Sequence, residues 1–109
     1  MIKNLFKLRE WESENLPLCH SSIGQSVFRY IAQCHLQGFT PSVKELVNDL
    51  PSFSRGGIRL QLKKLELDGW IKQTNGMADA RNRHITATPQ LETLLKQYRT
   101  QIRKHLPKQ

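Results

Sequence analysis

The order of local patterns between Thr40 and Thr88 constrains the fold more than any other feature of the sequence. A short helical pattern opens with the capping-box spacing Ser42-Val43-Lys44-Glu45 and ends at Pro51. A second helical pattern follows Ser52 or Ser54, either of which is able to cap a helix. Two segments typical of β-strands come next. Two short helices followed by a hairpin are the layout of a winged helix-turn-helix.

The second helix of this layout is expected over residues 54–67. Ile58, Leu62 and Leu65 recur at helical spacing and form one apolar stripe, while the basic residues of the segment fall mainly off that stripe. Gly69 follows the last apolar turn, where a glycine commonly ends a helix. We therefore expect a helix that buries one side and shows a basic side to solvent.

The hairpin is expected to use residues 70–74 and 83–88 as its two strands. Asn75-Gly76 directly follows the first strand and is a strong turn signal. The polar loop and the returning strand carry arginines, which makes the hairpin a basic wing. This arrangement suits a nucleic-acid duplex.

Helices are also expected on both sides of this layout. An amphipathic pattern covers residues 2–14, a longer one covers residues 22–37 with Gly38 as its C-terminal glycine, and a last helix begins at Thr88-Pro89. We expect a single domain over residues 1–109, mainly α with a small β-hairpin wing, in which a winged helix-turn-helix is flanked by N- and C-terminal helices. Its parts are the N-terminal helix and connector (1–16), the winged-helix core (22–88) and the C-terminal helix (89–109).

Charge is distributed unevenly along the 109 residues, which carry a formal net charge of +8. Residues 1–53 hold five basic and five acidic residues, whereas residues 54–109 hold twelve basic and four acidic residues. A basic half of this kind indicates a polyanionic partner. The alternative is a solvated basic surface without a partner.

The candidate nucleic-acid contacts lie on the second helix and on the wing. An α-helix fits the major groove of double-stranded DNA, and its first turn offers N–H groups to phosphate. Arginine is attracted by the negative potential of a narrow minor groove. We therefore expect helix 54–67 in the major groove and wing 72–85 in the minor groove. The candidate DNA-binding residues are Ser52, Ser54, Arg55, Gly57, Arg59, Lys63, Lys64, Lys72, Asp79, Arg81 and Arg83.

Gly56 and Gly57 are unusual so early in a helix, because each glycine costs about 1 kcal/mol relative to alanine. Close approach of the bare backbone to a phosphate would explain them. The alternative is that the helix begins later, near Ile58.

The end of this helix and the wing carry recognisable motifs, which are the run Leu65–Ile71, Asp79-x-Arg81 and Ile85-x-x-Thr88. Together they resemble the recognition-helix end and wing of the MarR family of bacterial transcriptional regulators, over about half of the chain. The resemblance implies that Arg81 is the minor-groove arginine, that Asp79 braces it, and that residues 54–67 form the recognition helix. No residue carries over a small-molecule site, so no cofactor is expected and an effector stays unassigned.

Dimerisation is expected from the terminal helices. The apolar stripes Leu5–Trp11 and Leu91–Leu106 exceed what a domain of this size would bury alone. A homodimer through these helices would match a palindromic DNA site. The alternative is that the two helices pack on each other within one monomer.

The two cysteines each precede a histidine, as Cys19-His20 and Cys34-His35. The spacing matches no common zinc motif, so no metal site is expected. Cys34 falls on an apolar stripe and is expected in the core, whereas Cys19 lies in a connector and is the alternative site for a redox-sensitive thiol.

Other classes of protein fit the sequence less well. No phosphate-binding glycine loop, paired-carboxylate site or nucleophilic triad occurs, so an enzyme is not expected. No apolar run approaches the ~20 residues of a membrane span, and the chain is expected in the cytoplasm. The expected function is sequence-specific binding of double-stranded DNA by a small regulator that acts as a repressor. The alternatives are a winged-helix protein-interaction module and a replication, partition or RNA-binding accessory factor.

Overall fold

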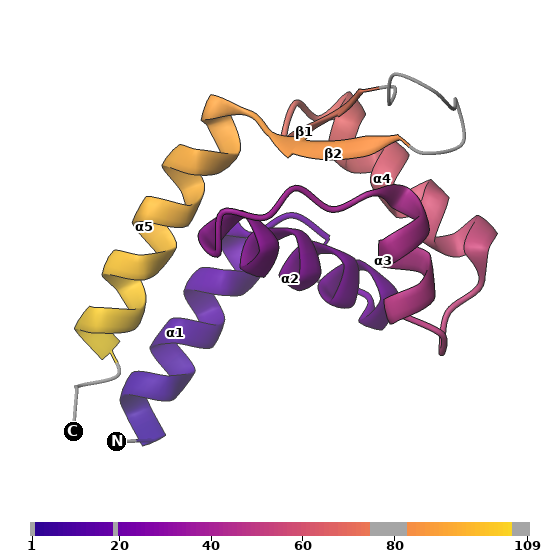
Figure 1. Cartoon of the computed structure of the whole chain (residues 1–109). Coiled ribbons are helices and arrows are strands. Elements are labelled where there is room, and N and C mark those ends of the chain that lie inside the picture. Colours follow the sequence, from indigo (N-terminus) through magenta and orange to yellow (C-terminus); the bar gives the residue numbers. More distant parts are fainter. Residues whose placement is uncertain (1, 19, 75–82, 106–109) are drawn as a thin grey trace.

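The computed structural model describes residues 2–18, 20–74 and 83–105, which form five helices and two strands (Figure 1). The fold is mainly α with one small antiparallel hairpin, as the sequence predicted, and all the expected helices and strands are present. No helix in this part of the chain is long and apolar enough to span a membrane. The elements are α1 (Ile2–Asn15), α2 (Ser22–Leu36), α3 (Val43–Asp49), α4 (Arg55–Leu67), β1 (Ile71–Thr74), β2 (His84–Ala87) and α5 (Pro89–His105).

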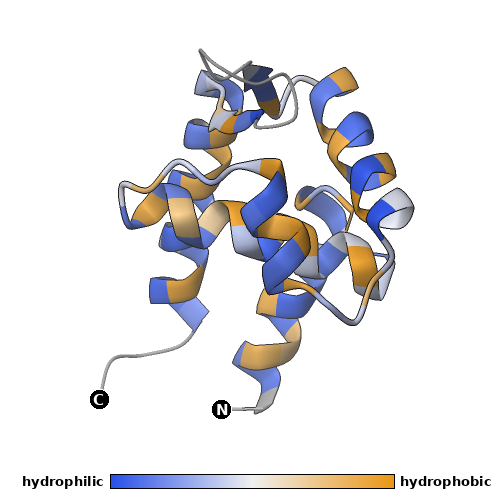
Figure 2. Ribbon diagram, turned by 45° about the vertical axis from the view of Figure 1, so that its right-hand side comes forward, coloured by the Kyte–Doolittle hydropathy of each residue, from blue (hydrophilic) through white to orange (hydrophobic). Residues whose placement is uncertain are grey.

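One apolar core lies between α2, α3, α4, α5 and the hairpin. The predicted stripe of α4 is buried in it, since Ile58, Leu62 and Leu65 are at most 1% exposed. Hydrophobic residues recur in bands along the helices, and hydrophilic residues separate them (Figure 2). The same spacing that predicted the helices therefore also determines which side of each helix is buried.

Side-chain caps define the starts of the two short helices. Ser42 accepts a hydrogen bond from the backbone N–H of Glu45, and the Glu45 carboxylate accepts one from the Ser42 N–H, which completes the predicted capping box. Ser54 caps α4 by accepting from the N–H of Gly57 at 3.0 Å. At the end of α2, Gly38 adopts a φ of +74°, as expected of a glycine beyond a helix C-cap.

A third segment, which the sequence did not predict, joins the hairpin. β1 and β2 pair antiparallel with Gln73 opposite Ile85. The N–H of Ile85 donates to the carbonyl of Pro41 at 2.9 Å, and the N–H of Val43 donates to the carbonyl of Arg83 at 2.8 Å. These two bonds attach the start of β2 to the segment that leads into α3.

The terminal helices α1 and α5 lie side by side within one chain (Figure 1). Trp11 stacks on Tyr98 with ring centroids 5.6 Å apart, and the Tyr98 hydroxyl donates to the Glu12 carboxylate. Burial and this carboxylate raise the pKa of Tyr98 to about 12. The alternative considered for these helices, packing within a monomer, is therefore present in the structure. Three apolar side chains of the two helices stay exposed, namely Leu5, Phe6 and Ile102.

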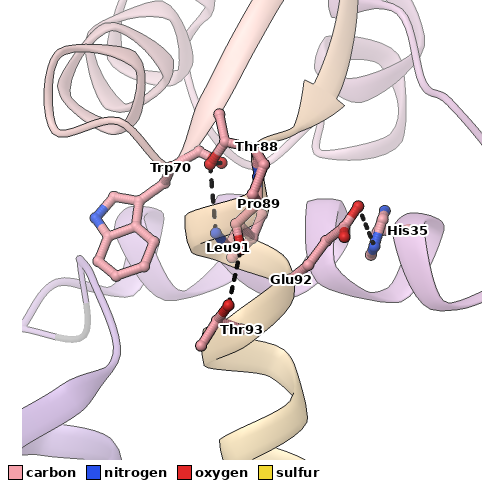
Figure 3. A network of polar contacts seen from close by, with 7 residues as sticks. All are labelled: His35, Trp70, Thr88, Pro89, Leu91, Glu92 and Thr93. Carbon is pink, nitrogen blue, oxygen red and sulfur yellow. Dashed lines mark hydrogen bonds and ion pairs between the residues drawn. The ribbon is translucent and has the colours of Figure 1, made fainter.

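The buried Thr88 joins the end of α4, the first strand and the start of α5 (Figure 3). Its hydroxyl lies 2.6 Å from the carbonyl oxygen of Gly69 and 3.0 Å from that of Trp70. The same oxygen accepts from the N–H of Leu91 at 3.3 Å, so Thr88 caps α5 as predicted. Gly69 has a φ of +85°, which lets the chain reverse between α4 and β1.

Thr88→Val should lower the free energy of unfolding by about 1–3 kcal/mol, because the isosteric methyl leaves buried carbonyls and the helix cap without their partner. Thr88→Ser keeps the hydroxyl and should retain most of the stability. Urea unfolding followed by circular dichroism measures both variants. A valine variant as stable as the wild-type chain would contradict this role of Thr88.

Candidate nucleic-acid interface

α4 turns one side to the core and the opposite side to solvent. Because an α-helix has 3.6 residues per turn, the ridge opposite the buried stripe consists of Gly56, Leu60, Lys63 and Leu67. All four are exposed, and the exposed fractions of Leu60 and Leu67 reach 51% and 76%. The outermost ridge of α4 is therefore apolar as well as basic.

The other basic side chains of α4 flank this ridge. Arg55 and Arg59 lie along one edge of it and Lys64 lies on the other edge, and all three are exposed, as the sequence predicted. Among the residues that the structure describes, the ion pairs join Arg9 to Glu12 and His35 to Glu92, so neither involves α4. The positive charge of this surface is thus not neutralised by the described part of the chain.

The two candidate serines have different positions before α4. Ser54 is the N-cap, and its oxygen accepts from Gly57 while its O–H remains a donor. Ser52 lies exposed in the turn between α3 and α4. The capping role falls to Ser54 alone, and both hydroxyls lie close to the positive end of the helix.

The two glycines at the start of α4 have different surroundings. The helix begins at Arg55, so the alternative start near Ile58 is wrong. A β-carbon on Gly57 would lie 2.8 Å from Cδ1 of Ile23, which means that this glycine lets α4 pack closely against α2. A β-carbon on Gly56 would meet nothing within 4 Å. Close approach of a ligand remains a prediction for both glycines, and Gly57 also has a packing role.

The wing residues that the structure describes point away from the core. Lys72 is exposed on β1, and Arg83 is exposed just before β2. The backbone N–H and the side-chain amide of Gln73 each donate to the Glu66 carboxylate at 3.4 Å. These bonds hold β1 beside the last turns of α4, so the basic wing and the basic helix lie next to each other.

Two predicted wing residues, Asp79 and Arg81, and the predicted turn at Asn75-Gly76 lie outside the described residues. Their roles stay predictions. Leu60 and Glu66 were not predicted from the sequence to take part in this surface. Leu60 was detectable, since it falls opposite the buried stripe, whereas the pairing of Glu66 with β1 depends on the fold.

A side-chain hydrogen bond joins α2 to α3, the first helix of the helix-turn-helix. The Tyr30 hydroxyl on α2 donates to the Asp49 carboxylate on α3 at 2.5 Å. Burial and this carboxylate raise the pKa of Tyr30 above its ordinary value, which keeps the donor proton in place across the physiological pH range. The bond contributes to holding α3 in place ahead of α4.

The cysteines give no sign of a metal centre in the part of the chain that is described. Cys34 is half-buried rather than a core residue, so that expectation was only partly correct. Burial, Glu45 and Asp49 raise the pKa of its thiol, which favours the less reactive protonated form. No group of three or more metal-ligating side chains occurs among the described residues, and Cys19 lies outside them.

A hollow of about 310 Å³ opens between α1, α2 and α5. Its lining combines apolar side chains such as Leu16 and Phe28 with Arg9 and Arg29. None of its lining residues belongs to α4 or to the hairpin. The hollow is therefore separate from the candidate interface.

The arrangement of helices and hairpin defines the chain as a winged helix-turn-helix protein. No protein-family model matches the sequence, and no curated protein matches it. Among solved structures, the MepR–DNA complex of S. aureus superposes with a TM-score of 0.72 at 14% identity, covering 94% of this chain and 79% of MepR.

Two further structures give similar results. The heme sensor protein PefR from Streptococcus agalactiae, in complex with heme, has a TM-score of 0.68 at 17% identity. The superposition covers 94% of this chain and 69% of the PefR chain. A mutant MarR from E. coli has a TM-score of 0.60 at 20% identity, and the superposition covers 93% of this chain and 68% of the MarR chain. The chain therefore has the winged-helix fold of MarR-family regulators, as the wing motif suggested.

Gly56→Ala should raise the free energy of unfolding by up to about 1 kcal/mol, because alanine favours the helix and its methyl group meets open space. Gly57→Ala should gain less, since its methyl group would displace Ile23 and crowd the cap oxygen of Ser54. Chemical unfolding of the two variants in parallel measures the difference. Equal stabilisation would show that the contact with α2 does not require a glycine.

Proposed function

We propose that the chain binds double-stranded DNA in a sequence-specific manner, with α4 in the major groove and the hairpin in the minor groove. The observation that carries the proposal is the exposed basic side of α4, whose charges have no ion-pair partner among the described residues. The similarity in fold to MepR, whose structure is a complex with DNA, supports the same use of this surface.

The residues of α4 would divide into two kinds of contact. Arg59 and Lys63, on or beside the outermost ridge, suit the acceptor edge of guanine, and Leu60 suits the methyl group of thymine. Ser52 and Ser54, before the helix, suit phosphate oxygens. Phosphate contacts would supply most of the affinity and fix the position on the duplex, and the few base contacts would supply the sequence specificity.

The wing would add contacts from the adjacent groove. Lys72 and Arg83 flank the tip and would bind phosphates. Arg81 is proposed to enter the minor groove, with Asp79 orienting its guanidinium, as the resemblance of the wing motif implies.

As a regulator, the protein is proposed to act in the cytoplasm as a homodimer that represses transcription by occupying its site. A two-fold dimer would place two copies of α4 in successive major grooves of a palindrome. The exposed apolar side chains Leu5, Phe6 and Ile102 on the terminal helices support self-association.

A second candidate function is a protein-interaction module. The exposed Leu60 and Leu67 on the outermost ridge of α4 favour it, because exposed leucines on one ridge are typical of a surface that meets another protein. Such a module would bind DNA weakly and without preference for sequence.

Arg59→Ala and Lys63→Ala should each weaken binding to a selected DNA site by about tenfold or more, as expected for the loss of a direct base or phosphate contact. Lys96→Ala on α5 is the matched control, because it removes an exposed positive charge from a helix outside the interface. Fluorescence anisotropy at physiological salt measures all three. If the three variants bind equally well, α4 is not the recognition helix.

The same assay separates the two candidate functions. The proposal predicts that competitor DNA of random sequence displaces the selected site poorly. Equal displacement by any duplex would favour the protein-interaction module.

A further inference from the structure

One acidic side chain lies on the otherwise basic surface of α4. Glu66 is exposed in the last turn of the helix, and Lys63 is its neighbour one turn earlier. A DNA duplex is a polyanion, so an exposed carboxylate at this place opposes binding through its charge. The presence of Glu66 on the candidate interface therefore needs a separate explanation.

The carboxylate of Glu66 bonds to an edge of the hairpin that the second strand does not reach. Its Oε2 accepts from the backbone N–H of Gln73, and its Oε1 accepts from the side-chain amide of Gln73, both at 3.4 Å. Ile85, which lies opposite Gln73, donates its own N–H to Pro41 on the far side of the hairpin. Opposed residues of an antiparallel pair are either both bonded to each other or both turned outward. The N–H of Gln73 therefore points to the free edge of β1, where Glu66 is its acceptor.

These bonds attach a part of the hairpin that the other contacts leave free. Thr88 bonds at the start of β1, and the segment before α3 bonds at the start of β2. The end of β1, which leads into the wing tip, lies beside the last turns of α4 (Figure 1). Within the described ranges, no side chain of α4 other than Glu66 hydrogen-bonds to a strand. Glu66 is thus a direct link from this helix to the wing.

We propose that Glu66 is a positioning residue of the DNA-binding surface. Its two bonds to Gln73 hold the wing at the place from which the wing and α4 meet adjacent grooves of one duplex together. A wing that is fixed before binding loses little freedom on binding, which lowers the cost of association. The inference rests on the DNA binding of the proposed function, and it gives a role to an acidic residue that does not itself have to touch DNA.

The charge of Glu66 and its hydrogen bonds have opposite effects on DNA binding. Removing the carboxylate raises the formal net charge of +8 by one unit, which by itself strengthens binding to any duplex. Removing the bonds frees the end of β1 from α4, which weakens binding to a site that both elements contact. The direction of the change therefore shows which of the two effects is larger.

The test compares two carboxylates at the same end of α4. Glu66→Ala should weaken binding to a selected DNA site by about threefold to tenfold, as expected for the loss of exposed hydrogen bonds to a charged group. Asp68→Ala is the matched control, because it removes an exposed carboxylate that has no ion pair in the described part of the chain. It should bind the site as tightly as the wild-type chain or more tightly. Fluorescence anisotropy at physiological salt measures the dissociation constants.

The conservative variant Glu66→Gln removes the charge and keeps the bonds. Its amide oxygen can accept from the N–H of Gln73, and its NH₂ group can donate to the side-chain amide of Gln73 once that amide has turned over. Glu66→Gln should therefore bind the selected site at least as tightly as the wild-type chain. Binding as weak as that of Glu66→Ala would overturn the inference.

Hydrogen exchange of the Gln73 amide, measured by NMR without DNA, reports the bond itself. Exchange should be about tenfold faster in Glu66→Ala than in the wild-type chain, and unchanged in Asp68→Ala. Loss of folding does not account for this result. Alanine favours a helix, and removing an acid from the C-terminal end of a helix suits its dipole, so thermal unfolding of Glu66→Ala should show a folded chain.

The outcomes separate this inference from the proposed function. A wild-type chain that binds no preferred DNA site overturns the proposed function. A wild-type chain that binds a specific site, together with a Glu66→Ala variant that binds it as tightly as Asp68→Ala, overturns the positioning role and leaves the proposed function standing. Weaker binding by Glu66→Ala without faster exchange at Gln73 would also overturn the positioning role, because the effect would then not pass through the bond.

Discussion

The hairpin is held from two sides by hydrogen bonds, and the position of the candidate interface depends on them. On one side, the backbone of Pro41 and Val43 pairs with the second strand ahead of α3. On the other side, the Thr88 hydroxyl bonds to the carbonyls that end α4 and begin β1, and caps α5. The hairpin, α4 and α5 are therefore fixed to one another through a few buried groups. Removing any of these groups leaves an unsatisfied partner inside the protein.

α4 serves the core and the candidate interface at once. Burial of Ile58, Leu62 and Leu65 fixes the rotation of the helix about its axis, and this rotation decides that Gly56, Leu60 and Lys63 face outward. Gly57 lets the helix start close against α2, while the bonds of Glu66 hold its other end beside β1. In the proposed complex, a helix fixed in this way would meet a duplex without having to fold on binding.

The sequence predicted those features that depend on neighbours along the chain. Helical spacing predicted the buried stripes, and Ser42 with Glu45 predicted the start of a helix. Both patterns are local, because capping and periodicity involve residues at most a few positions apart. The exposure of Arg55, Arg59 and Lys63 followed from the same spacing. Features that join distant segments were missed, such as the pairing of Pro41 with Ile85, the contact of Gly57 with Ile23, and the stack of Trp11 on Tyr98. No local pattern encodes these contacts, since they follow from the packing of the whole chain.

Selection of bound sequences from a pool of random DNA duplexes is the most direct test of sequence-specific binding by α4. The full-length protein would be incubated at physiological salt with an excess of non-specific competitor, and the recovered duplexes would be sequenced. We expect enrichment of one palindromic site with half-sites about one helical turn apart, because two copies of α4 would enter successive major grooves. Recovery of duplexes with no shared sequence would contradict it, and would leave the exposed ridge of α4 as a surface for another protein.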